Sequence, residues 1–187
     1  DGTLADTLAD IADAANHVLA ERGFATHPRE AYKDFVGHGV TALLELAMPG
    51  RTREDVTGVL SACRSRYDEH MLDKTRAYPG IDDLLRDLGA RGVPIAVLSN
   101  KHEPATRKIV DALFGRCSFV DVAGQMEDVP KKPDPQRALA IAQSGGDGRQ
   151  YCVSPTYSTI RDEDGRTVSL QSDDGRFVAI YVRVSVK

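Results

Sequence analysis

Several features that decide between classes of protein are scarce in this sequence. It has no tryptophan, and aromatic residues make up 6% of its 187 positions. It has no apolar run long enough to cross a bilayer, so we expect no membrane span. Basic residues are not in excess, because 24 lysines and arginines accompany 28 acidic residues and are scattered along the chain. Without a basic stripe, nucleic acid is not an expected partner.

Cysteine is equally scarce. The three cysteines, Cys63, Cys117 and Cys152, are odd in number and lack CxxC spacing. This pattern fits free thiols in a reducing compartment better than it fits a disulfide framework or a cysteine zinc site, and we take the compartment to be the cytoplasm. The chain also begins without an initiator Met, a basic segment or an apolar segment, so we expect no signal peptide and interpret the chain as a fragment.

The first part of the chain has helical periodicity throughout. Four helices are predicted, over residues 6–22, 28–36, 40–47 and 52–73. Gly23 ends the first helix, and Thr52 with Asp55 forms a pair typical of a capping box at the start of the last. Residues 9–75 are therefore expected to form one helical block.

Helix and strand alternate after Tyr78. Helices are predicted over 81–90, 104–114 and 136–142, and strands in "VPIAVLSN" and "SFVDVAG". The apolar runs predict strands buried on both faces, and the alternation predicts an α/β fold with a parallel sheet between helices. Residues 1–8 and 76–146 would form this core, and the helical block 9–75 would be a cap inserted over the carboxyl edge of the sheet.

The sequence changes character after Gly146. Two Asp-Gly turns, in "DEDGR" and "SDDGR", separate short strand-like runs, and "FVAIYVRVSV" alternates apolar and polar residues. Residues 147–187 are therefore predicted to be an atypical tail with β-hairpins or a β-meander. A shifted reading frame, a fusion and a real departure from the preceding fold would each produce such a tail.

Three short motifs follow the places where parallel strands would end. They are "DGT" at Asp1, "LSN" at Ser99 and "KKPDP" at Lys132. Each alone is weak, because "DGT" can be a turn, Ser-Asn a helix N-cap and the lysine a solvated loop residue. In this order they would meet at the carboxyl edge of one sheet, where such folds bind ligands.

Together with "FVGHG" and "YPG", these motifs resemble the haloacid dehalogenase-like hydrolase superfamily, and within it the phosphoglycolate phosphatases and their relatives. The resemblance covers about residues 1–146. It implies a Rossmann-like core with a helical cap that hydrolyses small phosphate monoesters with Mg²⁺. The reaction in this family passes through an aspartyl-phosphate. A small phosphorylated metabolite is thus the expected partner.

The resemblance also implies roles for individual residues. The family's nucleophilic aspartate would stand two positions before Asp1, upstream of this sequence. Asp1 would be the general acid and base, and its backbone carbonyl a Mg²⁺ ligand. Ser99 would hold phosphate oxygens with Asn100 beside it, and Lys132 would neutralise charge on the phosphoryl group. Lys131 is the rival for that last role.

Further positions follow from the family pattern. Gly37, His38 and Gly39 match a cap loop that faces the substrate, although His38 fits a surface polar residue equally well. The family's Gly-Asp pair and later acid, which complete the Mg²⁺ site, are replaced by other residues: Ser154, Pro155 and Thr159. Three nearby acids fit Asp-Gly turns better than metal ligation: Asp147, Asp162 and Asp164. We therefore expect residues 1–187 to be inactive by themselves.

Other functions stay open at this point. A non-catalytic phosphate-binding or regulatory module would keep Ser99 and Lys132 and bind phosphate without turnover. The dehalogenase branch is disfavoured by Asp1, because a dehalogenase needs no acid for a leaving alkoxide. A mutase relative is compatible with the same motifs.

Overall fold

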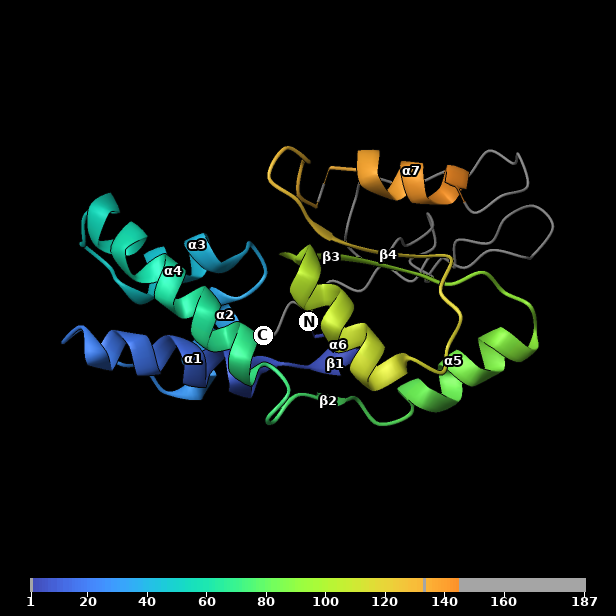
Figure 1. Ribbon diagram of the computed structural model, residues 1–187, viewed down its shortest axis with the longest axis horizontal. Coiled ribbons are helices and arrows are strands. Elements are labelled where there is room, and N and C mark those ends of the chain that lie inside the picture. Colours follow the sequence, from blue (N-terminus) through green and yellow to red (C-terminus); the bar gives the residue numbers. More distant parts are fainter. Residues whose placement is uncertain (1, 133, 145–187) are drawn as a thin grey trace, which may run out of the picture.

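The computed structural model describes residues 2–132 and 134–144. A helical lobe and an α/β lobe lie side by side (Figure 1). The helical lobe consists of α1 (Leu8–Glu21), a 3₁₀ turn (Arg29–Ala31), α2 (Tyr32–Phe35), α3 (Val40–Ala47) and α4 (Arg53–His70). The α/β lobe consists of α5 (Ile81–Ala90), β3 (Ala96–His102), α6 (Glu103–Phe114), β4 (Asp121–Gln125) and α7 (Gln136–Ser144). Between the lobes lie β1 (Ala5–Asp6) and β2 (Arg76–Ala77).

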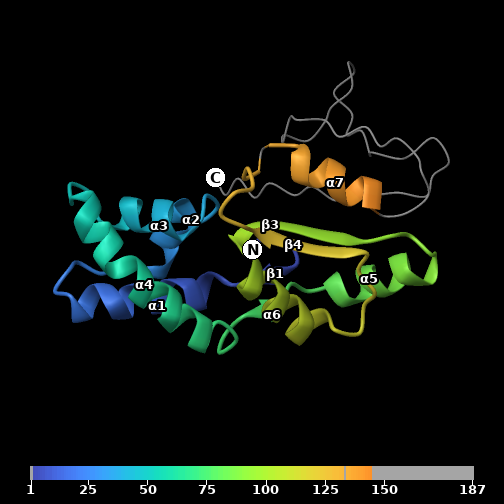
Figure 2. The same ribbon diagram turned by 45° about the horizontal axis from the view of Figure 1, so that its top comes forward.

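The sheet of the α/β lobe is parallel, as predicted. β3 pairs with β4 so that Ala96 lies opposite Asp121 and Leu98 opposite Ala123. Helices α5 and α6 cover one face, and α7 lies on the other (Figure 2). A small apolar core beneath the sheet contains Val110 and Phe114 of α6. This arrangement confirms the α/β class and the helices on both sides of the sheet.

The strands are less buried than the sequence predicts. Residues 96–101 of β3 are half-buried rather than enclosed on both faces, and His102 is exposed. Among the described residues β3 has one neighbouring strand, β4, so its other edge contributes no burial. A continuous apolar run predicts a buried strand only when strands flank both edges.

Several predicted helix ends differ from the structure, among them the start of α1 and the end of α4. Helix α1 begins at Leu8 and not at Asp6, because Asp6 pairs with Arg76 in the β1–β2 ribbon. The Asp6 carboxylate then accepts a hydrogen bond from the Leu8 N–H at 3.1 Å. Helix α4 ends at His70, and a turn follows in which the Asp73 N–H donates to the His70 carbonyl at 3.1 Å.

The start of α4 agrees with the sequence prediction. The Thr52 hydroxyl accepts from the Asp55 N–H at 3.2 Å, and the Thr52 N–H donates to the Asp55 carboxylate at 3.1 Å. This is the reciprocal capping box that the Thr-x-x-Asp spacing predicts. None of the helices in the described ranges is both long and apolar enough to cross a bilayer.

The helical lobe packs around Tyr32, which is fully buried. Its hydroxyl donates to Asn16 Oδ1 at 2.7 Å, and Asn16 also binds both backbone groups of His27. Burial raises the pKa of Tyr32 to about 12. Buried in the same core, Cys63 has its pKa raised by burial to about 11. Cys63 and Cys117 are free thiols, as expected, and Cys152 lies outside the described residues.

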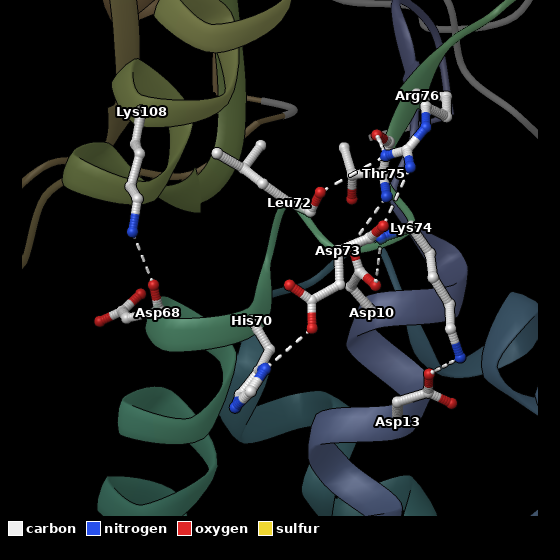
Figure 3. Close-up of polar contacts among 10 residues, drawn as sticks. All are labelled: Asp10, Asp13, Asp68, His70, Leu72, Asp73, Lys74, Thr75, Arg76 and Lys108. Carbon is white, nitrogen blue, oxygen red and sulfur yellow. Dashed lines mark hydrogen bonds and ion pairs between the residues drawn. The ribbon is translucent and has the colours of Figure 1, made fainter.

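Two chain segments connect the lobes, and they are bound to each other. β1 and β2 form an antiparallel ribbon in which Ala5 pairs with Ala77. Next to this ribbon, the Asp10 carboxylate of α1 accepts hydrogen bonds from the N–H groups of Lys74 at 3.0 Å and Thr75 at 2.8 Å (Figure 3). Asp10 is only 3% exposed, so this carboxylate is an internal tie between α1 and the returning segment. The returning segment is residues 71–77, which lead from the end of α4 back to the α/β lobe.

The returning segment is also held from its other side. The Arg76 guanidinium donates to three backbone carbonyls, those of Leu72, Asp73 and Thr75 (Figure 3). These carbonyls belong to the turn after α4, outside any helix, so a side-chain donor supplies their hydrogen bonds. The turn between α4 and β2 is therefore fixed by one acid and one base that lie on opposite sides of it.

Gly124 of β4 lies against the start of α6. A Cβ at this position would be 2.3 Å from Glu103 Cα and 2.8 Å from the Lys101 carbonyl oxygen. Backbone atoms cannot move aside as a flexible side chain can, so only glycine fits here. This close approach sets the path of the chain just after Asn100.

Replacing Gly124 with alanine is expected to lower the free energy of unfolding by about 2 kcal/mol, because the methyl group forces β4 away from α6. Urea denaturation measures the change. Gly89 of α5 is the matched control, since a Cβ there meets nothing within 4 Å. Gly89→Ala should stabilise the protein by roughly 0.5–1 kcal/mol. Equal effects of the two substitutions would contradict the packing described for Gly124.

Candidate active site

The candidate site lies at the carboxyl end of β3. Ser99 and Asn100 are part of that strand, and Lys131 and Lys132 belong to the segment that follows β4. The Asp134 N–H donates to the Lys131 carbonyl at 2.9 Å and closes a turn around Lys132. The Asp134 carboxylate then accepts from the Gln136 N–H at 2.9 Å, which starts α7. The polar residues of "KKPDP" therefore build the turn that carries the lysine.

Strand β3 and this turn are in direct contact. Asn100 Oδ1 accepts from the Lys132 N–H at 2.9 Å, and Lys132 Nζ donates to the Leu98 carbonyl at 2.9 Å. Residues 32 positions apart in the sequence are thus neighbours, as the motif order predicts. Asp1, the third predicted member and the source of the predicted Mg²⁺-binding carbonyl, lies outside the described residues.

Ser99 is half-buried beside this contact. Its hydroxyl oxygen accepts from the Lys101 N–H at 3.1 Å. A serine hydroxyl that accepts one hydrogen bond can still donate its proton to an anion. The bond to Lys101 fixes the rotamer from which it would do so.

Lys132 is an ammonium group in an unfavourable environment. Burial lowers its pKa from the ordinary value of 10.5. Within residues 2–132 and 134–144, no carboxylate forms an ion pair with it, and its hydrogen-bond acceptor is the neutral Leu98 carbonyl. A half-buried cation without a counter-ion is stabilised when an anion binds next to it. This side chain is suited to hold a phosphate group.

The rival lysine has a different environment. Lys131 is exposed, and its Nζ donates to the His38 carbonyl at 3.3 Å. A Cβ on Gly39 would be 3.3 Å from the same nitrogen. Lys131 thus contacts the cap loop, while Lys132 contacts the strand that carries Ser99.

The cap loop, residues 37–39, meets the core through its backbone. The Gly37 carbonyl accepts from Asn100 Nδ2 at 3.1 Å, and the His38 carbonyl accepts from Lys131. Gly37 and Gly39 have φ values of 124° and 92°, which favour glycine. The His38 side chain is exposed. Glycine conformation, rather than the imidazole, therefore turns this loop toward the core.

One contact near the site was missed by the sequence analysis. Lys101 Nζ donates to the Tyr67 hydroxyl at 2.8 Å and lies 4.4 Å from the centre of the Tyr67 ring. This joins β3 to α4 of the helical lobe, and a cation over an aromatic face is a favourable arrangement. Lys101 directly follows the "LSN" motif, but no motif pointed to a partner 34 positions earlier.

The described residues do not form a metal site by themselves. No group of three or more His, Cys, Asp or Glu side chains comes together anywhere in residues 2–132 and 134–144. The donors at the site are a hydroxyl, an amide and lysine ammonium groups, and Mg²⁺ requires oxygen ligands, mainly carboxylates. The described site therefore fits an anion and does not fit a divalent cation.

Comparison with known proteins agrees with this geometry. A family model for haloacid dehalogenase-like hydrolases matches residues 1–146. The chain belongs to this family. A phosphoglycolate phosphatase from Mesorhizobium japonicum is 31% identical over 98% of this chain and 83% of its own length. The phosphoglycolate phosphatase of Aquifex aeolicus is 34% identical over 79% of this chain and 68% of its own length.

Solved structures of family members share the fold. A protein from Lactobacillus delbrueckii subsp. bulgaricus, described as a phosphoglycolate phosphatase, superposes with a TM-score of 0.68 at 28% identity. The match covers 75% of this chain and 68% of that protein. The predicted family and the Rossmann-like core of the haloacid dehalogenase-like hydrolases are thereby confirmed. The assignment of roles to single residues stays a prediction.

Proposed function

We propose that this chain provides the phosphate-binding core and the cap of a phosphatase acting on small phosphate monoesters. The observation that supports the proposal most is Lys132, a half-buried ammonium with a lowered pKa at the end of the Ser99 strand. Phosphoglycolate is the proposed substrate type, because the relatives that match carry that name. A phosphomonoester dianion supplies the counter-charge that Lys132 lacks among the described residues.

The proposed roles follow the family pattern. Ser99 donates to a non-bridging phosphate oxygen and Lys132 neutralises the phosphoryl charge. Asp1 protonates the leaving alkoxide and then deprotonates the attacking water, and the nucleophilic aspartate stands two positions before it. Mg²⁺ is the proposed cofactor and would screen the charges of nucleophile and phosphate. Its ligands, including the Asp1 carbonyl, would have to come from outside the described residues.

Boundaries and location are proposed on the same basis. The core would comprise residues 1–8 and 76–146 and the cap residues 9–75, with the β1–β2 ribbon as the junction. Residues 147–187 would form a separate tail. A cytoplasmic location is proposed from the free thiols of Cys63 and Cys117.

A second function is supported by the donor set. The described site offers cations, an amide and a hydroxyl, with no cluster of carboxylates beside them. A non-catalytic phosphate-binding or regulatory module needs only these groups. It differs from the phosphatase in one respect, which is turnover.

Residues 1–187 are expected to bind inorganic phosphate but to leave phosphoglycolate and p-nitrophenyl phosphate intact in the presence of Mg²⁺, because the nucleophile lies upstream of Asp1. Fusing the upstream strand of a relative, ending in aspartate and one further residue, should start hydrolysis, and Asp1→Asn should stop it. Phosphate binding without turnover in the fused protein would favour the non-catalytic function. Steady hydrolysis by residues 1–187 that Asp1→Asn abolishes would contradict the proposed role of the upstream nucleophile.

A further inference from the structure

The side chain of Asn100 joins three segments of the protein. Its Nδ2 donates to the Gly37 carbonyl of the cap loop at 3.1 Å and to the Lys132 carbonyl at 3.1 Å. Its Oδ1 accepts from the Lys132 N–H at 2.9 Å. An N–H can only donate, so this last contact fixes which end of the amide is oxygen. Both Nδ2 hydrogens are therefore engaged.

This pattern gives Asn100 a task other than touching the substrate. The family resemblance implies that Asn100 binds substrate beside Ser99, yet both of its donor positions are directed at protein carbonyls. We propose that Asn100 is a positioning residue that couples docking of the cap loop to the placement of Lys132. This inference rests on the proposed function, because it takes Lys132 as the phosphate-binding group.

The geometry of the lysine turn explains how the coupling works. Asn100 binds both the N–H and the carbonyl of Lys132, so the backbone of that residue is held from one side. Lys132 Nζ donates at 2.9 Å to the carbonyl of Leu98, which lies in β3, the strand that also carries Asn100. Rotation of the Asn100 amide would release the Lys132 backbone and the cap loop at the same time.

The cap side of the contact depends on backbone atoms. Gly37 presents its carbonyl from a φ of 124°, and a Cβ on Gly39 would be in ordinary van der Waals contact with the Asn100 carbonyl oxygen, at 4.0 Å. Lys131 adds a second bond, to the His38 carbonyl, that does not involve Lys132. Asn100 and Lys131 thus hold the same loop, but only Asn100 also holds the catalytic-site lysine.

Coupling of this kind acts in both directions. If a docked cap loop favours the position of Lys132 that binds phosphate, phosphate bound at Lys132 must favour the docked loop by the same factor. The cap would then close more firmly on a loaded site than on an empty one, through a single amide. Lys131 strengthens docking without making it depend on phosphate.

Amide hydrogen exchange of residues 1–187, followed by NMR, tests the proposal. In the absence of phosphate, Asn100→Ala should speed exchange of the Lys132 amide and of residues 36–40 by about tenfold. Lys131→Met should speed exchange in residues 36–40 alone. Asn100→Asp keeps an acceptor for the Lys132 N–H but no donors, so it should release the cap loop and leave the Lys132 amide protected.

Inorganic phosphate is added in a second set of exchange measurements. It should slow exchange of residues 36–40 in the unchanged protein and in Lys131→Met, and this protection should vanish in Asn100→Ala. Unchanged exchange of the Lys132 amide in Asn100→Ala, or phosphate protection that survives that substitution, would overturn the proposal. If the unchanged protein binds no phosphate, the proposed function fails, whereas the phosphate-free arm still decides whether Asn100 links the two segments.

Discussion

Replacing Lys132 with methionine is expected to weaken the binding of inorganic phosphate by about 100-fold. This factor is close to the loss of catalytic rate that follows when one donor is removed from a preorganised oxyanion site. The ammonium is half-buried, so its interaction with an anion is less screened than that of a surface lysine. Methionine keeps most of the side-chain volume and removes only the charge. Isothermal titration calorimetry with phosphate measures the change.

The same substitution should leave the protein as stable as before or more stable at neutral pH. Burial lowers the pKa of Lys132 below its ordinary value of 10.5. At pH values between the lowered pKa of the folded chain and 10.5, the folded chain therefore binds fewer protons than the unfolded chain. The free energy of unfolding of the unchanged protein therefore rises with pH across this window. In Lys132→Met that contribution to the rise is absent, and urea denaturation at several alkaline pH values measures the difference.

Lys131 provides the control for both measurements. It is exposed and contacts the His38 carbonyl of the cap loop, so Lys131→Met should weaken phosphate binding by no more than about threefold through loss of a screened charge. A large loss of binding in Lys131→Met together with normal binding in Lys132→Met would reverse the assignment of the two lysines.

Replacing Asp10 with alanine is expected to lower the free energy of unfolding by about 3 kcal/mol or more, since two backbone N–H groups lose a charged acceptor. These are the N–H groups of Lys74 and Thr75, of which Thr75 is itself buried. The alanine offers no acceptor, and water reaches a buried N–H poorly. Urea denaturation of the variant measures the loss.

The matched control lies one turn further along α1. Asp13 is about half exposed and pairs with the Lys74 ammonium (Figure 3). Surface ion pairs contribute about 0–1 kcal/mol, so Asp13→Ala should cost little. Asp10→Asn, which keeps one acceptor oxygen, should fall between the two. Equal losses for Asp10→Ala and Asp13→Ala would show that the internal tie contributes nothing beyond ordinary surface charge.

Sequence periodicity predicts the helices of this protein well and its junction poorly. The predicted ranges 40–47 and 81–90 coincide with α3 and α5, because apolar spacing and glycine ends are local signals. Strands β1 and β2 have two residues each, too few to show alternation. Asp10 looked like an ordinary residue near a helix start, since its partners lie more than 60 positions away.

The site could be predicted in part for similar reasons. Ser99 lies in the carboxyl-terminal half of β3 and Lys132 follows β4 of the same parallel sheet, so topology alone brings them to one edge. The Asn100–Gly37 bond uses a backbone carbonyl, which every residue has and which leaves no mark in the sequence. The separate environments of Lys131 and Lys132 likewise depend on the turn closed by Asp134, and spacing alone left both lysines as candidates.

Every role proposed for this site depends on phosphate binding beside the Lys132 ammonium. The most direct measurement is the pKa of the Lys132 side chain, followed by NMR of its labelled ε-methylene with and without saturating inorganic phosphate. This pKa is expected to lie below 10.5 in the free protein and to rise when phosphate binds. Phosphate binding that leaves the Lys132 signal and its pKa unchanged would contradict it.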